Sequence, residues 1–324
     1  MIDRRRFSVA VAGASLLAKN SFAQQAFPDH PIRLVVPYGP GTATDIIARQ
    51  ITAVAQRALG QPFVIDNRPG AGGLTGTEVV ARAAPDGYTL VMGTSQTHAI
   101  SPILFKRSPY DPIRDFTAIV GLAGVQHVLA VGPQLGVNSI AELMALGKSQ
   151  PGKLTFASTG NGTPAHLAGE IFKREAGFEM THVPYPGGAQ ALTDVMAGTV
   201  SMVFYPYAAL KPFVDGGKLR ALATANPTRP VWLPNLQTMP EAGYPKSVMT
   251  ATFGIYGPAN MQADRVARIS DAFRQALASP ELVSALSVSG TDVQVQSAAE
   301  LKAFTVTEYD RYKAIVTMSG AKVD

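Results

Sequence analysis

Two hydrophobic patterns alternate along most of the chain, and their order predicts the fold class. Short apolar runs such as Ile32 to Pro37 and Tyr88 to Gly93 have the length of buried strands. Between such runs, apolar residues recur at helical spacing, as from Ile46 to Leu59. Strands that alternate with helices are typical of an α/β fold built on a parallel sheet, in which ligands bind beyond the C-terminal ends of the strands.

The stretch from Ile32 to Gln50 indicates a strand, a Gly/Pro/Thr turn and a helix that begins near Ile46, capped by Thr44 or Asp45. Residues 154–172 repeat the arrangement, with Thr163 as the expected N-cap and Pro164 at the first helical position. Unpaired backbone N–H groups at such helix starts favour small anions. Gly-rich turns of this kind also serve only to reverse the chain in many α/β proteins, and both interpretations stay open.

Two longer β-rich stretches, near residues 116–132 and 248–258, predict strands that pass between two lobes. A chain of 324 residues with 46% hydrophobic content can bury more than one core. We expect lobe 1 at residues 24–124 plus 251–324 and lobe 2 at residues 125–250. Two linking strands are the geometry of a hinge.

The N-terminus predicts export. Arg4, Arg5 and Arg6 precede an apolar run that is shorter than the roughly 20 residues a membrane-spanning helix needs, and Ser21 to Ala23 fits a cleavage site. We expect cleavage after Ala23 and a periplasmic mature protein. The Arg-Arg-x-Phe start favours the twin-arginine route, and the general secretory route remains an alternative.

Composition excludes several function classes. Loss of residues 1–23 lowers the formal net charge from +5 to +2 and leaves no basic block, so we expect no nucleic-acid partner. The absence of cysteine excludes thiol chemistry, and five scattered histidines predict no transition-metal site. The run from Gly70 to Gly76 has Thr75 where a dinucleotide fingerprint needs glycine. We therefore expect no cofactor and no metal.

An enzymatic function is not expected, because no nucleophile, base and orienting residue occur at recognisable positions. The segment around Ser95 has Thr97 where a nucleophile elbow needs glycine. The alternative is a periplasmic hydrolase built on the same two-lobed fold, with its catalytic partners far apart in the sequence.

Ordered segments of the chain resemble the periplasmic solute-binding receptors of tripartite tricarboxylate transporters, the TctC or Bug-type family. They include IRLVVPYGPGTATDIIAR, QPFVIDNRPGAGGLTGTEVVARAAPDGYTLVMGT, GNGTPAHLAGEIFK and HVPYPGGAQALTDVMAGTVSMVF. The resemblance runs from about Phe27 to the C-terminus. It implies a Venus-flytrap fold whose lobes close over a small carboxylated ligand: a di- or tricarboxylate, an aromatic acid or an acidic amino acid. We expect the protein either to deliver its ligand to the membrane subunits of such a transporter or to act as a sensor, and to be a monomer.

The resemblance assigns ligand binding to four turns. These are Tyr38, Gly39, Pro40, Gly41, Thr42 and Asp45 in the first, Thr94 and Ser95 in the second, Ser158, Thr159, Asn161, Thr163 and His166 in the third, and Tyr185, Gly187, Gly188 and Asp194 in the fourth. Thr42 departs from the family, which usually has glycine there. Its side chain either restricts approach to the backbone or adds a hydroxyl donor.

Several of these residues have a structural alternative. Asp45 is expected to cap or lock its turn, because a carboxylate ligand would repel it. His166 either donates to the ligand or is a structural histidine, and Asp194 either accepts from a ligand donor or bonds backbone N–H groups. The short polar side chains of Thr159, Asn161 and Thr163, around a helix start, suit a carboxylate. Arg68 is the single arginine in the predicted cleft turns.

Overall fold

A ten-stranded mixed sheet runs through the computed structural model, which describes residues 27–105, 107–230, 233–288 and 290–319. Its main order is β2-β1-β3-β9-β4-β7-β5-β6, and β8 and β10 also pair with β4. The bounds are β1 Ile32–Val36, β2 Phe63–Asn67, β3 Thr89–Thr94, β4 Phe116–Val131, β5 Leu154–Ser158, β6 Met180–Pro184, β7 Met202–Pro206, β8 Arg220–Thr224, β9 Thr250–Pro258 and β10 Thr291–Gln296. The predicted export signal lies outside the described residues.

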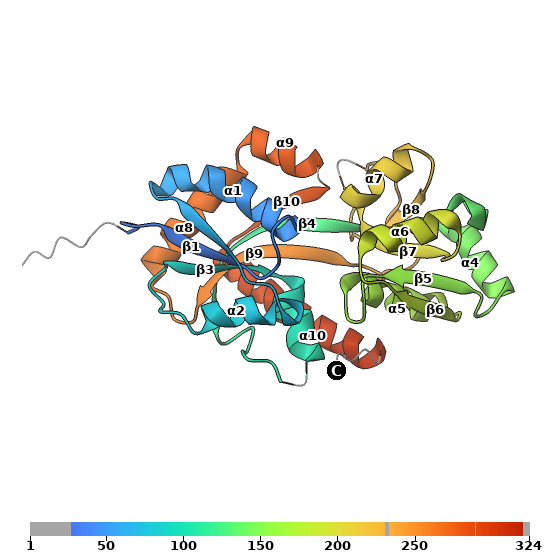
Figure 1. The fold of residues 1–324 in the computed structure, drawn as a ribbon, viewed down its shortest axis with the longest axis horizontal. Helices are drawn as coiled ribbons and strands as arrows, with labels where there is room; N and C mark the ends of the chain where they lie inside the picture. Colours follow the sequence, from blue (N-terminus) through green and yellow to red (C-terminus); the bar gives the residue numbers. More distant parts are fainter. Residues whose placement is uncertain (1–26, 106, 231–232, 289, 320–324) are drawn as a thin grey trace, which may run out of the picture.

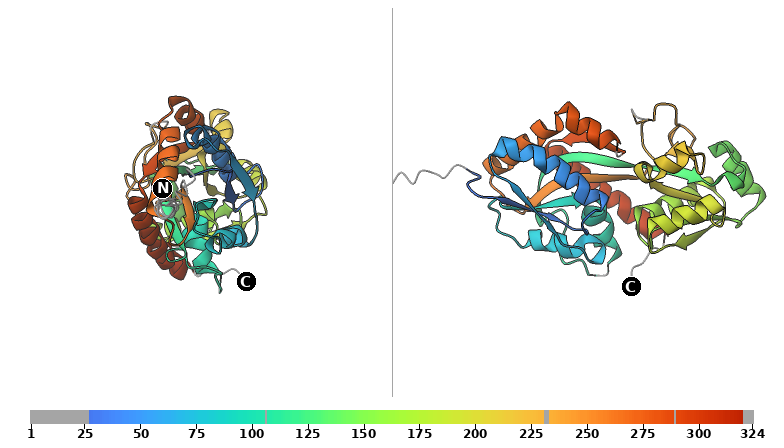
Figure 2. Two further views of the ribbon diagram at one scale, coloured as in Figure 1. Left: turned by 90° about the vertical axis from the view of Figure 1, so that its left-hand side faces the viewer. Right: turned by 45° about the horizontal axis from the view of Figure 1, so that its top comes forward.

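The sheet belongs to two lobes that lie end to end, joined by β4 and the entry to β9 (Figures 1 and 2). From Phe116 to Gln126, β4 pairs antiparallel with β9, and from His127 to Val131 it pairs with β7. The chain returns through Met249, whose N–H donates to the carbonyl of Ala225 at 2.7 Å, into β9. This arrangement confirms the predicted α/β fold with two lobes joined by two crossing strands.

Lobe 1 has helices on both faces of its strands. On one face lie α1 Ala43–Leu59, α8 Ala263–Leu277 and α9 Pro280–Val288. The apolar residues of α1 recur at helical spacing, so one side of the helix enters the core, with Ile51 and Ala55 buried. The other face carries α2 Leu74–Ala81 and the first half of α10 Ala298–Ser319. Gly76 lets α2 approach the ends of β1 and β2 closely, because a Cβ there would lie 2.9 Å from Cα of Pro37 and 2.6 Å from the carbonyl oxygen of Arg68.

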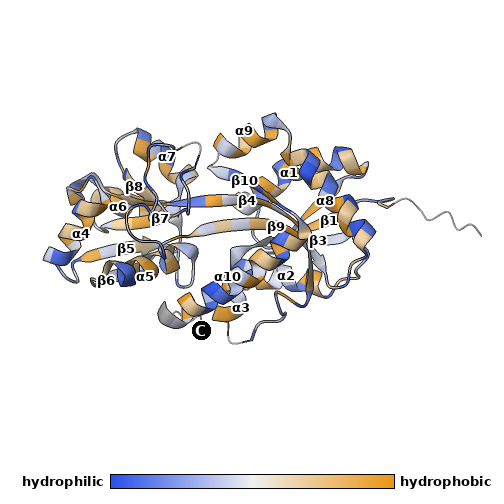
Figure 3. Cartoon of the chain, turned by 180° about the vertical axis from the view of Figure 1, so that it is seen from behind, coloured by the Kyte–Doolittle hydropathy of each residue, from blue (hydrophilic) through white to orange (hydrophobic). Residues whose placement is uncertain are grey.

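Lobe 2 is likewise covered on both faces. One face carries α4 Ile140–Ser149 and α5 Pro164–Ala176, which bury Leu143, Leu167 and Phe172. The other carries α6 Gly188–Ala197 and α7 Tyr207–Asp215. Coloured by hydropathy, the helices of both lobes carry mixed apolar and polar residues (Figure 3), as expected for helices that cover a sheet on one side only.

Helix α10 reaches both lobes. Its first half packs in lobe 1, where Leu301 is buried and the Thr305 hydroxyl lies 2.9 Å from that of Tyr256. Its second half joins the core of lobe 2 through Tyr312 and Ile315. Seen from behind, the helix extends from beneath β9 toward α5 (Figure 3). The lobes are thus connected by a helix as well as by strands.

The structure corrects four details of the predicted elements. The N-cap of α1 is Thr42, so the predicted caps, Thr44 and Asp45, are wrong. The amphipathic pattern from about Ala263 to Leu286 predicts one helix, but the structure has two: α8 ends at Leu277, and α9 begins at Pro280, a residue that favours a helix start and cannot continue a preceding helix. The sheet is mixed, because β9 and β10 run antiparallel to their partners. Helix α7 and strand β10 were not predicted.

Candidate functional site

A cavity of about 440 Å³ lies between the two lobes. Its walls come from the C-terminal ends of strands, the starts of helices and the crossing strand β9. The lining residues are Tyr38, Thr44, Gly72, Thr94, Ser95, Gln96, Leu104 and Phe105 from lobe 1, Thr159, Asn161, Gly162, Thr163 and Pro164 from lobe 2, and Ala251 and Phe253 from β9. None of these side chains carries a charge.

In the first turn, Tyr38 reaches the cavity but the four residues after it do not. The Tyr38 hydroxyl lies 3.1 Å from that of Thr94, and burial raises the pKa of Tyr38 to about 12. Gly39, Pro40, Gly41 and Thr42 do not line the cavity. Gly41 has a φ of +79°, a conformation that favours glycine. The turn therefore presents one aromatic side chain to the space between the lobes.

Asp45 locks this turn from inside the protein. Its Oδ2 accepts from the backbone N–H of Gly41 at 2.9 Å, and its Oδ1 accepts from Asn67 Nδ2 at 2.9 Å. Arg49 Nε donates to both oxygens at 3.0 Å, and these bonds, led by that of Arg49, lower the pKa of Asp45 to about 2. The carboxylate is therefore buried, and its hydrogen bonds hold the turn in place.

Thr42, the position where the family usually has glycine, is also used within the turn. Its hydroxyl donates to the carbonyl of Gly39 at 2.9 Å and accepts from the N–H of Asp45 at 3.4 Å. The side chain caps α1, as threonine commonly does at a helix start. The hydroxyl is therefore a local cap rather than a donor to the cavity.

The second turn supplies two buried hydroxyl groups, at the end of β3. Ser95 Oγ lies 2.7 Å from Thr252 Oγ1 and accepts from the Thr252 N–H at 2.9 Å. A π-helical turn, Gln96–Ile100, follows at once and brings Gln96 to the cavity. Ser95 therefore bonds a threonine of the crossing strand, and no histidine among the described residues pairs with it.

The third turn forms the lobe 2 wall. Thr163 is the N-cap of α5 and Pro164 its first residue, which confirms the predicted start of that helix. The Thr163 hydroxyl donates to the carbonyl of Gly160 at 2.8 Å. Thr159, Asn161 and Thr163 all line the cavity. Three short polar side chains thus stand around one helix N-terminus.

Ser158 and His166, predicted beside this wall, lie behind it. Ser158 is fully buried, and its Oγ is 2.6 Å from Nε2 of His182. His166 Nδ1 accepts from the N–H of Gly162 at 3.0 Å, and its ring stacks on that of His182 with centroids 4.0 Å apart. Burial lowers the pKa of His166 to about 4, with a smaller effect from His182. A neutral His166 therefore supports the turn.

The fourth turn does not line the cavity. Tyr185 donates a hydrogen bond of 2.7 Å to Oδ2 of Asp194, and burial together with this bond raises the pKa of Tyr185 to about 12. A Cβ at Gly188 would collide with the Tyr205 hydroxyl, so this glycine is required by packing. Arg68 pairs with Asp66 at 3.1 Å and is likewise absent from the lining.

The structure thus brings Tyr38, Thr94, Ser95, Thr159, Asn161 and Thr163 together around one cavity. The other predicted residues lie outside the lining, in the first turn, behind the lobe 2 wall or on the fourth turn. Sequence reasoning missed Gln96, Leu104, Phe105 and Phe253, which supply an amide and an apolar lining. Phe253 lies in a stretch that was already predicted to cross between the lobes, and this position alone could have indicated that it lines a cavity between them.

The electrostatics of the cavity come from backbone dipoles. The first turn of α5, with Pro164, and the first turn of α1, with Thr44, both contribute to the lining. Helix N-termini carry partial positive charge and favour an anion.

Among the described residues, no group of three or more histidine or acidic side chains could hold a metal ion. In the same part of the chain, no helix has the length and hydrophobicity needed to span a membrane.

Comparison with known proteins gives the same family throughout. The model of the tripartite tricarboxylate transporter family receptor matches residues 47–321. BugT of Bordetella pertussis is 32% identical over 316 residues, which are 97% of this chain and 96% of that protein. Among solved structures, R. palustris Rpa4515 with adipate is 32% identical, with a TM-score of 0.78 over 91% of this chain and 99% of that chain. MatC from Rhodopseudomonas palustris with bound malate is 30% identical, with a TM-score of 0.75 over 90% and 100%.

These matches cover nearly all of the described residues and agree with the observed two-lobed fold. They also remove the hydrolase alternative, because the family and the similar solved structures are substrate-binding receptors. The chain therefore belongs to the tripartite tricarboxylate transporter receptor family, the TctC or Bug type of periplasmic solute-binding receptor, and is not an enzyme.

Proposed function

We propose that this receptor captures a small carboxylated organic acid between its lobes and holds it by lobe closure. The observation that carries the proposal is the uncharged cavity lined by the starts of α1 and α5 and by the polar side chains of Thr94, Thr159 and Asn161. A carboxylate gains from helix dipoles and from hydrogen-bond donors, and neither requires an arginine.

The shape of the cavity supports an acid with an apolar body. Leu104, Phe105 and Phe253 line it beside the polar groups, and a volume of about 440 Å³ lies in the range of small-molecule sites. Two similar solved structures hold adipate and malate, both dicarboxylates. We include di- and tricarboxylates, aromatic acids and acidic amino acids in the proposed class.

Closure would bring the fourth turn, with Tyr185, Gly187, Gly188 and Asp194, toward the ligand. In the described structure these residues lie outside the lining of the cavity, and they belong to lobe 2, which the crossing strands connect to lobe 1. Closure serves transport or sensing when the partner distinguishes the closed, liganded state from the open one. The membrane subunits of a tripartite tricarboxylate transporter are the proposed partner.

The first test is a thermal-shift screen of residues 24–324 against mono-, di- and tricarboxylates, aromatic acids and acidic amino acids, each paired with its neutral amide. A ligand at about 100 times its dissociation constant stabilises the fold by roughly 2.7 kcal/mol. For a chain of this size the melting temperature should then rise by about 4 °C. Stabilisation by an acid but not by its amide is expected. Stabilisation by neutral compounds only would remove the proposal.

Variants then locate the binding. Asn161→Ala removes a side chain of the lobe 2 wall and should weaken binding of the stabilising acid. Asn235→Ala changes an exposed residue outside the cavity and should leave that binding unchanged. Solution scattering of the wild type should show compaction when the acid is added. An unchanged scattering profile at saturation would contradict closure while leaving the acid specificity intact.

A further inference from the structure

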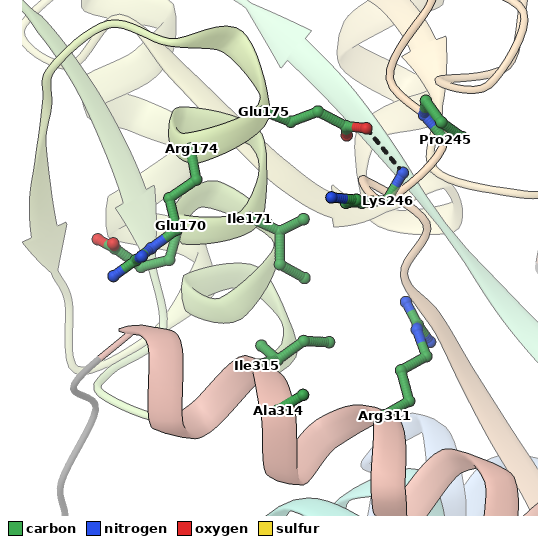
Figure 4. Close-up of a pocket in the computed structure, with 9 residues that line it drawn as sticks. All are labelled: Glu170, Ile171, Arg174, Glu175, Pro245, Lys246, Arg311, Ala314 and Ile315. Atoms are coloured by element: carbon green, nitrogen blue, oxygen red, sulfur yellow. Dashed lines mark hydrogen bonds between the residues drawn. The ribbon is translucent and has the colours of Figure 1, made fainter.

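A second cavity, of about 500 Å³, lies between α5, the loop at residues 245–246 and the end of α10 (Figure 4). It shares no lining residue with the cavity between the lobes. We call it the α5–α10 seam; it is lined by Glu170, Ile171, Arg174, Glu175, Pro245, Lys246, Arg311, Ala314 and Ile315. The family site does not account for it.

The middle of the seam is apolar. Ile171 of α5 faces Ile315 of α10 across the space, with Ala314 beside it (Figure 4). Packed helices normally interlock their side chains and leave few voids larger than a water molecule. A volume of about 500 Å³ between two helices is instead the size of a small-molecule site.

The charged groups at the rim of the seam differ in whether they already have a partner. Glu175 already accepts from the N–H of Lys246 at 2.9 Å and from the N–H and hydroxyl of Ser247 at 2.9 and 2.7 Å. By contrast, the Lys246 side chain is exposed and its ammonium makes no ion pair within the described chain. Figure 4 shows Arg311 directed toward this loop from α10.

The other charged groups of the rim are held in place. Arg311 pairs with Glu308 at 3.1 Å and donates to the carbonyl of Val248, so its guanidinium is fixed at the Lys246 end. Arg174 and Glu170 lie together at the opposite end (Figure 4). Burial raises the pKa of Glu170, because it disfavours the charged carboxylate. At this end of the seam Lys246 is therefore the cation without an ion pair in the described chain, and the guanidinium of Arg311 lies near it.

We propose that the α5–α10 seam is a second ligand site, which takes an amphipathic organic anion. The apolar body lies between Ile171 and Ile315, and the anionic group meets Lys246 and Arg311. Both cations can donate charge-assisted hydrogen bonds to it. Because α5 begins at the cavity between the lobes and reaches the seam at its other end, an occupant also contacts the helix that forms the primary site.

The test uses anilinonaphthalene sulfonate, an aromatic anion whose fluorescence rises in apolar sites, and phenylnaphthylamine, its neutral counterpart without the sulfonate. We expect saturable binding of one sulfonate dye per chain and clearly weaker binding of the neutral one. Lys246→Gln should weaken binding of the sulfonate dye about fivefold, which corresponds to the loss of one charge-assisted hydrogen bond at an accessible position. Lys148→Gln, an exposed lysine on α4, should leave binding unchanged.

Two filling variants separate the cavities. Ala314→Trp places an indole in the seam from an exposed helix position and should abolish the saturable signal, whereas Asn161→Trp fills the cavity between the lobes and should not. Circular dichroism checks that both tryptophan variants are folded. If either variant fails to fold, the comparison of Lys246→Gln with Lys148→Gln still tests the proposal. Equal binding of the two dyes, no saturable binding, or loss of signal with Asn161→Trp but not with Ala314→Trp would each overturn the proposal. None of these outcomes bears on capture of an acid between the lobes.

Discussion

The phenol of Tyr185 donates a hydrogen bond of 2.7 Å to the carboxylate of Asp194, nine residues later in the chain. The pair joins the turn before α6 to the helix itself, and Tyr185 is largely buried. Asp194 was predicted either to accept from the ligand or to bond backbone N–H groups. In the described structure one of its oxygens is already bonded to a tyrosine instead, and the pair fixes the shape of the turn proposed to close.

We predict that Tyr185→Phe lowers the free energy of unfolding by about 1.5 kcal/mol, because it leaves a carboxylate without a buried donor. Urea unfolding measures the change. The matched control is Tyr309→Phe, since the Tyr309 hydroxyl makes no hydrogen bond within the described chain. Equal effects of the two substitutions would show that the bond to Asp194 contributes nothing of its own.

Asp45 should make the free energy of unfolding depend on pH in the acidic range. Its folded pKa is about 2, below the ordinary value near 3.8, so the unfolded chain binds the proton more readily. Its contribution is complete above pH 4 and is lost as the pH falls toward 2. We expect Asp45→Asn to cost about 2 kcal/mol at pH 7 and little at pH 2. Asp271→Asn, an exposed carboxylate on α8, is the control, and parallel pH curves for both variants would refute the assignment.

His166 acts in a higher pH range. Its folded pKa is about 4, so the unfolded state binds more protons between that value and the ordinary 6.5. Its contribution is complete above pH 6.5 and falls by about 2 kcal/mol at pH 5. His166→Asn keeps an acceptor for the Gly162 N–H but cannot be protonated there. We expect a flatter stability curve between pH 7 and pH 5; a slope equal to that of the wild type would contradict the prediction.

The N-cap of α5 offers a way to separate folding from ligand binding. Thr163→Val removes the capping hydroxyl and should destabilise the protein by about 1 kcal/mol. Ser139→Ala removes the corresponding cap of α4, outside the cavity, at a similar cost. Only Thr163→Val should also reduce the melting shift given by the stabilising acid. An equal loss of ligand response in both variants would assign the effect to stability alone.

Local signals in the sequence were sufficient for most elements. Thr163 followed by Pro164 marks a helix start unambiguously, and the long apolar stretch from Phe116 matches β4. The start of α1 was less certain, because Thr42, Thr44 and Asp45 are all residues that favour N-caps. The backbone decides in favour of Thr42, whose φ of −70° and ψ of 159° are extended, and it leaves Asp45 in the first helical turn.

What the sequence could not provide is placement across long distances. Ser95 and Thr252 meet because β3 and β9 are neighbours in the sheet, and no local pattern predicts that pairing. Helix α7 was missed because Pro212 interrupts its pattern, and the six-residue strand β10 is stabilised by its pairing with β4. The seam could not be predicted either, because α5 and α10 are far apart in the sequence, at residues 164–176 and 298–319.

Helix α10 has a consequence for how the molecule is made. It is the last described element to leave the ribosome, and it supplies Leu301 to one core and Tyr312 to the other. Until it is present, each lobe lacks part of its buried surface, so neither is complete on the nascent chain. Because one helix contributes to both cores, we predict that denaturant unfolds the two lobes together rather than one after the other, with coincident transitions by different probes.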